Sequence, residues 1–268
     1  VIGGFQGVSY RRDITTLGRG GSDTSAVALA AALKAERCEI YSDVDGVYTT
    51  DPNIIKDAKH LPEMSYQQLQ EMAEAGAKVL NAQAVQFAKE AKIALYSRST
   101  FSPGRETVIR ETAPADKPSV IAVVHEIDII RCIYHKHNLN ETFPALHSFL
   151  EEKNIHIKEL SLVEDDSASK VSFIISKNNI HNWNKIEKEL LNSFGKDISL
   201  NDSFAAVSLI GEGFSRDNRI VSESIKILSE NKINFFGLAT TSFRLSLLVK
   251  KEYLEQTVRL LHKHWIEN

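Results

Sequence analysis

The feature that most constrains the fold is a polar stretch at residues 111–118, because it separates two different patterns of apolar segments. The stretch reads Glu-Thr-Ala-Pro-Ala-Asp-Lys-Pro, and its two prolines resist a continuous helix or strand. We therefore predict one domain over residues 1–112, a linker over 113–118, and a second region beyond it. The chain has 268 residues, enough for about two domains that bury a core without disulfides or metals.

The first region alternates strand and helix. From Val1 to about Arg110 an apolar strand, a glycine loop, an alanine-rich helix, a strand and another helix follow one another. This alternation is typical of a layered α/β domain with a mostly parallel sheet, of which the chain holds about half.

The second region repeats a strand-helix-strand-strand-helix order. We predict two ferredoxin-like βαββαβ modules, over residues 119–200 and 201–268, between which strands are exchanged. The sequence predicts strands at 120–124, 127–134, 155–162, 171–175, 205–210, 233–239 and 243–249, and helices at 143–153, 183–192, 220–231 and 253–264.

Charge and composition exclude some classes of partner. A net charge of -3 gives no general attraction to nucleic acid or anionic membranes, and basic and aromatic residues are not interleaved as in nucleic-acid readout. No apolar run approaches the roughly 18 residues that span a bilayer, and the start of the chain is unlike a signal peptide. We expect a cytoplasmic protein in which Cys38 and Cys132 are buried, reduced thiols.

The segment at residues 15–33 carries the strongest chemical signal, because a glycine-rich turn leads directly into an alanine-rich helix. We predict that Ser22, Asp23 or Thr24 caps this helix. The amide groups of such a turn favour an anion, Arg19 can grip a carboxylate with two parallel hydrogen bonds, and Asp23 can meet an ammonium group. An amino-acid substrate would satisfy both; the alternative is an ordinary helix start with a solvated arginine.

Four motifs in order resemble those of aspartate kinases, and the likeness continues to the end of the chain, most closely to the single-function, lysine-sensitive branch. They are Phe5-Gln-Gly-Val, Thr15-Thr-Leu-Gly-Arg-Gly-Gly-Ser-Asp-Thr, Cys38-Glu-Ile-Tyr-Ser-Asp-Val-Asp-Gly-Val-Tyr-Thr-Thr-Asp-Pro52 and Gly76-Ala-Lys-Val-Leu80. The resemblance implies part of an amino-acid-kinase (carbamate-kinase-like) domain followed by two ACT domains.

It also implies an activity and its residues. An aspartate kinase transfers phosphate from ATP, with Mg²⁺, to the side-chain carboxylate of L-aspartate, the first step towards diaminopimelate and lysine, threonine and methionine. By resemblance Asp23 organises the catalytic site. The aspartate contacts would be Arg19, Gly20, Gly21 and Ser22, and the ATP contacts Ser42, Asp43, Tyr48, Asn53, Lys78 and Val79.

Some positions depart from the family pattern. Asn53 replaces the usual arginine, and Asn81-Ala-Gln83 replaces His-Pro-Arg, which removes a cation near the phosphates. The family's opening Lys-Phe-Gly-Gly is not in these residues, and Val1 begins what reads as a buried strand. We therefore expect a preceding catalytic segment and an isolated chain that is inactive.

Two other functions stay open at this point. A non-catalytic, amino-acid-binding regulatory subunit would explain the absence of the opening lysine segment. A kinase acting on glutamate or N-acetylglutamate is the other alternative, although two ACT-like modules argue against it.

The ACT resemblance implies an amino-acid effector, lysine or threonine, and a homodimer or higher oligomer formed through these modules. The effector residues would be His137, Asn138, Glu141, Thr142 and Lys158. Lys158 stands where lysine-sensitive relatives have an acidic side chain, and its charge would repel a lysine ammonium group.

Two His-Lys-His triplets, at residues 135–137 and 262–264, invite a metal hypothesis. Without further ligands, such pairs are more often surface residues, so we assign no transition metal and expect these histidines at the surface.

Overall fold

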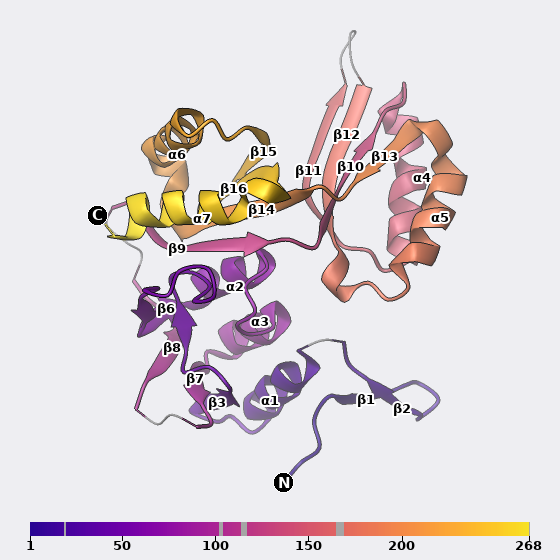
Figure 1. The fold of residues 1–268 in the computed structure, drawn as a ribbon. Helices are drawn as coiled ribbons and strands as arrows, with labels where there is room; N and C mark the ends of the chain where they lie inside the picture. The colour runs from indigo at the N-terminus through magenta and orange to yellow at the C-terminus, as the bar shows by residue number, and fades with distance from the viewer. Residues whose placement is uncertain (19, 102–103, 114–116, 165–168, 268) are drawn as a thin grey trace. The chain divides into compact units, whose positions relative to one another are not determined.

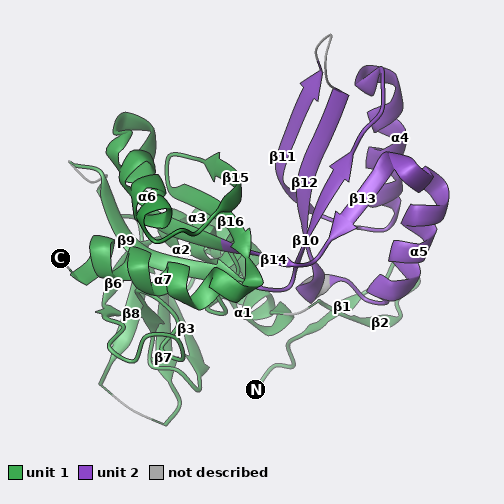
Figure 2. Cartoon of the chain, turned by 45° about the horizontal axis from the view of Figure 1, so that its top comes forward, with its two compact units in different colours: residues 1–126, 207–268 green, residues 127–206 purple. Residues whose placement is uncertain are grey.

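The computed structural model describes residues 1–18, 20–101, 104–113, 117–164 and 169–267. They form two compact units, one of residues 1–126 with 207–268 and one of residues 127–206 (Figure 2). No helix in the described ranges is long and apolar enough to cross a membrane.

The first part of unit 1 is a layer of helices on a four-stranded sheet with the order β3-β7-β8-β6 (Figure 1). Strands β3 and β7 are parallel, as are β6 and β8, while β7 and β8 are antiparallel. The sheet strands are β3 (Arg37–Ser42), β6 (Glu63–Ser65), β7 (Ala94–Ser99) and β8 (Glu106–Arg110). The helices are α1 (Gly21–Ala32), α2 (Tyr66–Glu74) and α3 (Ala82–Ala91), and the hairpins are β1 (Gln6–Val8) with β2 (Ile14–Thr16) and β4 (Val47–Tyr48) with β5 (His60–Leu61).

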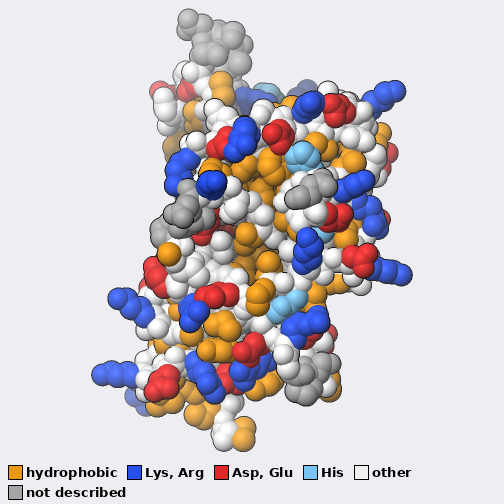
Figure 3. Space-filling model, turned by 90° about the vertical axis from the view of Figure 1, so that its left-hand side faces the viewer, with side chains coloured by type: hydrophobic (Ala, Val, Ile, Leu, Met, Phe, Trp, Pro, Cys, Tyr) orange, Lys and Arg blue, Asp and Glu red, His pale blue; other side chains and the backbone are white. Residues whose placement is uncertain are grey.

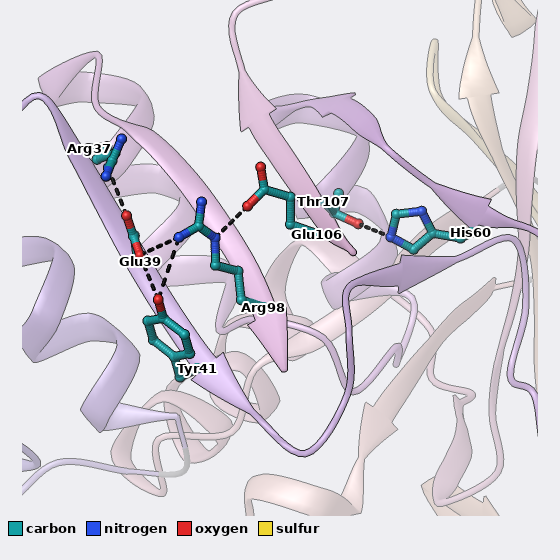
Figure 4. A network of polar contacts seen from close by, with 7 residues as sticks. All are labelled: Arg37, Glu39, Tyr41, His60, Arg98, Glu106 and Thr107. Carbon is teal, nitrogen blue, oxygen red and sulfur yellow. Dashed lines mark hydrogen bonds and ion pairs between the residues drawn. The ribbon is translucent and has the colours of Figure 1, made fainter. Parts of the chain in front are cut away.

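Charged side chains tie three of these strands together (Figure 4). Arg98 on β7 pairs with Glu106 on β8 and, at 2.6 Å, with Glu39 on β3. Glu39 also accepts a hydrogen bond from Tyr41 at 2.9 Å. That hydrogen bond, with the neighbouring guanidinium groups, holds the pKa of Glu39 below its ordinary value. The network fixes the register of β3, β7 and β8 on the sheet face that carries these side chains.

The second part of unit 1 is a sheet with the order β15-β16-β14-β9. Its strands are β9 (Ser119–Glu126), β14 (Phe204–Glu212), β15 (Phe235–Thr240) and β16 (Arg244–Lys250). Figure 1 shows α6 (Arg219–Glu230) and α7 (Leu254–His262) on one side of this sheet and α2 on the other. A π-helical turn at Lys263–Glu267 continues α7.

Strand β9 joins a different sheet from the one that the sequence predicted. The prediction assigned residues 119–126 to the first module, but β9 pairs beside β14 in the second sheet. The close approach of the two strands depends on Gly211, since a Cβ there would lie 1.8 Å from the carbonyl oxygen of Ser119. The observed division of the chain therefore falls at residues 126 and 206.

The two parts of unit 1 share one hydrophobic core. Leu69 and Met72 of α2 belong to the same buried cluster as Ala122 and Val124 of β9 and Ile210 of β14. Two polar contacts also link α2 to the second sheet. Arg244 lies 3.3 Å from Glu71, and Gln68 donates to Glu212 at 3.0 Å.

Unit 2 is a four-stranded antiparallel sheet with the order β11-β12-β10-β13, covered on one side by two helices (Figure 2). Its elements are β10 (Ile129–Tyr134), α4 (Leu139–Glu152), β11 (Ile157–Glu164), β12 (Ser169–Ser176), α5 (Trp183–Phe194) and β13 (Ile198–Asn201). Cys132, Leu146, Phe173 and Leu190 lie in its core. Short 3₁₀ turns at Lys177–Asn179, Gly195–Asp197, Phe214–Arg216 and Lys251–Tyr253 complete the described elements of the two units.

Both cysteines are free and buried, as the sequence predicted. On the face drawn in Figure 3, basic and acidic side chains are interspersed with hydrophobic ones. That face therefore carries no field of a single sign.

Candidate active site

The glycine turn ends at Gly20, which is the N-cap of α1. The prediction that Ser22, Asp23 or Thr24 caps the helix is wrong, because the helix already begins at Gly21. Gly20 has φ +77, which glycine adopts without strain, and it has no side chain to occupy the first amide groups of the helix. The N-terminus of α1 is thus suited to an anionic ligand. Arg19 lies outside the described residues.

Asn81, at the start of α3, packs directly against this turn. A Cβ on Gly20 would lie 2.7 Å from the Cβ of Asn81, and Thr24 donates to the Asn81 side chain at 3.5 Å. Asn81 caps α3 by accepting hydrogen bonds from the backbone amides of Gln83 and Ala84, at 2.9 and 3.3 Å. The departure from the family pattern at 81–83 therefore supplies a helix cap and joins the segment of Lys78 and Val79 to the turn of Gly20.

Asp23, half-buried in the first turn of α1, faces the same junction. Its carboxylate accepts a hydrogen bond from the Asn81 amide at 3.4 Å and lies 3.5 Å from the Ser22 hydroxyl. Burial raises the pKa of Asp23, and the two hydrogen bonds oppose this only in part. A desolvated carboxylate next to an anion-binding helix start is typical of a functional site rather than of a solvated surface.

The first residues predicted to contact ATP lie at the end of β3 and in the loop that follows it. Ser42 ends that strand beside Ser99 of the parallel strand β7, and its carbonyl accepts a hydrogen bond from the Thr100 amide at 2.8 Å. The Ser42 hydroxyl accepts from the Val44 amide at 3.2 Å, which bends the exposed turn that carries Asp43.

Tyr48 is held by polar neighbours that the sequence did not indicate. Its hydroxyl donates to Asp45 at 2.6 Å and accepts from Arg105 at 3.3 Å, and its ring lies edge-on to His60. His60 contacts Thr107 at 3.4 Å (Figure 4), so the hairpin β4-β5 is fastened to β8. The hydrogen bond from Tyr48 holds the pKa of Asp45 below its ordinary value.

Asn53 and Lys78 occupy two loops that border β9. Asn53 donates to Asp51 at 2.9 Å within a tight turn, and Lys78 is exposed. The loop of Lys78 lies against β9, because a Cβ on Gly76 would be 2.7 Å from that of Glu126. Burial lowers the pKa of His125 on β9, the charge of Asp51 opposes this shift in part, and the charge of Lys78 adds to it. Both loops therefore lie near the same strand.

Comparison with known proteins agrees with this arrangement. The model of the amino acid kinase family matches residues 1–96, and an ACT domain model matches residues 199–263. Over 98% of its length the chain is 33% identical to an aspartokinase of Pseudomonas aeruginosa, of which it covers 65%, and 34% identical to one of Thermus thermophilus, of which it covers 66%. The chain is thus a relative of the aspartokinases over almost its whole length. It spans about two thirds of the length of these curated relatives, slightly less in each case.

A solved aspartokinase also has the same arrangement. E. coli aspartokinase III in complex with aspartate and ADP matches 97% of this chain with a TM-score of 0.84 and 28% identity, and the match covers 59% of that protein. The T-state complex of the same protein with lysine and aspartate gives a TM-score of 0.78. The predicted fold, a partial amino-acid-kinase domain with ACT modules, is thereby confirmed.

The residues predicted to bind an effector lie in unit 2, at the start of α4 and on β11. Asn138 is the N-cap of α4 with φ +55, and its carbonyl accepts from the amides of Glu141 and Thr142, each at 3.0 Å. His137 precedes it and is exposed. Lys158 lies on β11, next to a bulge in the pairing with β12.

Sequence reasoning did not predict the contacts that Asn81, Thr49 and His262 make beside the predicted site residues. Asn81 could have been found as an asparagine directly before an alanine-rich helix, which is a capping signal. Thr49 lies inside the motif already singled out. His262 is fully buried, so the expectation that it lies at the surface is wrong, and local sequence gives no sign of its distant partner.

Proposed function

We propose that this chain provides the nucleotide-binding half and the ACT modules of an aspartate kinase, which converts L-aspartate to 4-phospho-L-aspartate with ATP. One observation carries the proposal: Asn81 joins the turn of Gly20 and Asp23, assigned to aspartate, to the segment of Lys78 and Val79, assigned to ATP. The residues assigned to the phosphoryl donor, ATP, and those assigned to the phosphoryl acceptor, aspartate, thus meet at Asn81. The bound aspartate and ADP of E. coli aspartokinase III support the same assignment.

The chemistry asked of these residues is positioning and charge neutralisation, since phosphoryl transfer needs no covalent nucleophile. The start of α1 would stabilise the carboxylate charge of aspartate, and the ammonium group of Lys78 would stabilise the negative charge of the phosphates. The residues fit Mg²⁺, which is usually held by substrate phosphates, water and one or two carboxylates, here Asp23 or Asp43. When bound, the ion would neutralise part of the negative charge of the phosphates.

Lys78→Ala is expected to weaken binding of MgADP about tenfold or more, because it removes a charge-assisted contact made by an exposed side chain. Calorimetric titration of the whole chain measures this. Lys188→Ala removes the same charge from an exposed position on α5 of unit 2 and should leave the affinity unchanged. Equal effects of the two substitutions would show that only net charge matters.

The function itself is tested by titrating the chain with MgADP and L-aspartate separately, together with a phosphorylation assay. Binding of both supports the kinase assignment; binding of amino acids without nucleotide would instead identify a regulatory subunit. Because ATP and L-aspartate are cytoplasmic metabolites, we place the enzyme in the cytoplasm, at the entry to lysine, threonine and methionine synthesis.

We further propose that the ACT modules form a homodimer. In each ACT-like sheet an edge strand exposes large apolar side chains, a feature that often marks an interface. On β11 these are Leu160, Leu162 and Val163, and on β15 Phe235, Phe236 and Leu238. Sedimentation of the chain tests the assembly.

The effector site that we propose at α4 is partly filled by the protein itself. The carboxylate of Glu164, on β11, accepts a hydrogen bond from the Leu139 amide at 2.9 Å. It therefore holds the helix start that the carboxylate of an amino-acid effector would use. An effector has to displace it, and the charge of Lys158 favours threonine over lysine.

Glu164→Ala is expected to tighten threonine binding to the chain about fivefold, because it removes the competing carboxylate. Titration calorimetry with threonine and lysine measures the change. Glu151→Ala, at the exposed C-terminal end of the same helix, should have no effect. Weaker threonine binding after Glu164→Ala would place the effector elsewhere.

A further inference from the structure

His262, near the end of α7, is the buried link between the second ACT-like sheet and the first ATP loop. Its Nε2 lies 2.9 Å from the hydroxyl of Thr49, and its Nδ1 lies 3.0 Å from the carboxylate of Glu267. The exposed fractions of His262 and Thr49 are 0% and 3%. Because water cannot replace a lost partner here, removing either side chain costs free energy of folding.

Each hydrogen-bonding group of the Thr49 and His262 side chains has a partner. The Lys59 amide donates to the Thr49 hydroxyl at 3.0 Å, so that hydroxyl can donate its own proton to Nε2 of His262. Nδ1 then donates to Glu267. A proton on Nδ1 thus satisfies both partners of the ring, which gives the ring a single orientation.

Thr49 is the point where several elements converge on the loop of Tyr48. Its amide donates to the Lys59 carbonyl at 2.9 Å, and its carbonyl accepts from the Val123 amide of β9 at 2.7 Å. The Lys59 ammonium group also donates to the Ile266 carbonyl at 2.8 Å, beyond the end of α7. Residues 47–53 are therefore fastened to β9 by backbone and to the C-terminal helix by side chains.

We propose that His262 is a positioning residue for the nucleotide: through Thr49 it holds the loop that carries Tyr48 and Asn53 against α7. The functional part of this inference rests on the proposed ATP site, whereas the mechanical part does not. The C-terminal helix thereby acts on nucleotide affinity without touching the nucleotide.

Hydrogen exchange of the whole chain tests the mechanical part. His262→Ala and Thr49→Val should each increase amide exchange over residues 47–61 about tenfold, and Thr49→Ser, which keeps the hydroxyl, should restore protection. Combining the two substitutions should add little to either alone, because both remove the same contact. His264→Ala is the matched control, since His264 is two residues further on, exposed, and paired with Glu223.

Titration with MgADP and with aspartate tests the functional part. His262→Ala and Thr49→Val should raise the Kd for MgADP about five- to thirtyfold and leave that for aspartate within about twofold, with Thr49→Ser close to wild type. Unchanged exchange over residues 47–61 in either variant would overturn the inference. Faster exchange with unchanged MgADP affinity would overturn its functional part. If the wild-type chain binds no MgADP, the proposed function fails, and the exchange data still decide whether His262 holds the loop.

Discussion

Gly211→Ala is expected to destabilise unit 1 more than any other single methyl group added to a described glycine. The new Cβ would lie 1.8 Å from the carbonyl oxygen of Ser119, a backbone atom that moves only if β9 separates from β14. Overpacking of this kind costs about 3 kcal/mol or more. For a unit of this size, that corresponds to a fall in melting temperature of roughly 6–12 °C. Scanning calorimetry and denaturant unfolding measure both quantities.

A second glycine of the same sheet provides the control. At Gly237, on β15, a Cβ would lie 3.3 Å from the Leu248 side chain, which can shift. Gly237→Ala should therefore cost less than about 1 kcal/mol. If both variants unfold alike, the close approach of β9 and β14 does not limit the stability of unit 1.

The strand and helix positions of the ACT-like modules could be predicted because each element has its own apolar period. The predicted helix at 183–192 is observed as Trp183–Phe194, and the predicted strand at 205–210 as Phe204–Glu212. The sheet that a strand joins could not be predicted in the same way. Nothing within residues 119–126 distinguishes pairing with β14 from pairing with β10, because the decisive contact is made by Gly211, far along the chain.

The same distinction applies to the site. The glycine turn and the loop of Ser42 and Tyr48 could be proposed from the sequence, because sites for phosphate or carboxylate groups typically place particular residues close together in sequence. The neighbours that hold them are remote: Thr107 fastens the hairpin of Tyr48 through His60, and His262 reaches Thr49 across most of the chain. Such contacts depend on tertiary packing, which local propensity does not encode.

Asp23→Asn is expected to abolish most kinase activity of the complete enzyme while making this chain more stable at neutral pH. In the proposed aspartate kinase, loss of the carboxylate charge assigned to the aspartate amine should lower kcat/KM for aspartate about 10²- to 10³-fold. The stability gain follows from burial, which raises the pKa of Asp23 in the folded state above its unfolded value. The folded state then binds the proton more tightly than the unfolded state does.

The raised pKa of Asp23 also determines how the stability difference between Asp23→Asn and the wild type changes with pH. The stability that the protonated carboxyl contributes is fully present below the pKa of Asp23 in the unfolded state. It is lost as the pH rises through the pKa of Asp23 in the folded state. At neutral pH the wild-type chain therefore carries the whole cost of a desolvated charge. The amide side chain of the variant keeps the shape and an acceptor for the Asn81 amide without that cost. The melting temperature of Asp23→Asn should thus exceed that of the wild type at pH 7, and the difference should shrink as the pH falls towards about 4, near the ordinary pKa of an aspartate. Asp57→Asn, at an exposed turn position, should show neither effect. A destabilised Asp23→Asn would mean that Asp23 serves the fold of α1 rather than the reaction, since a residue retained at a cost in stability is retained for its chemistry.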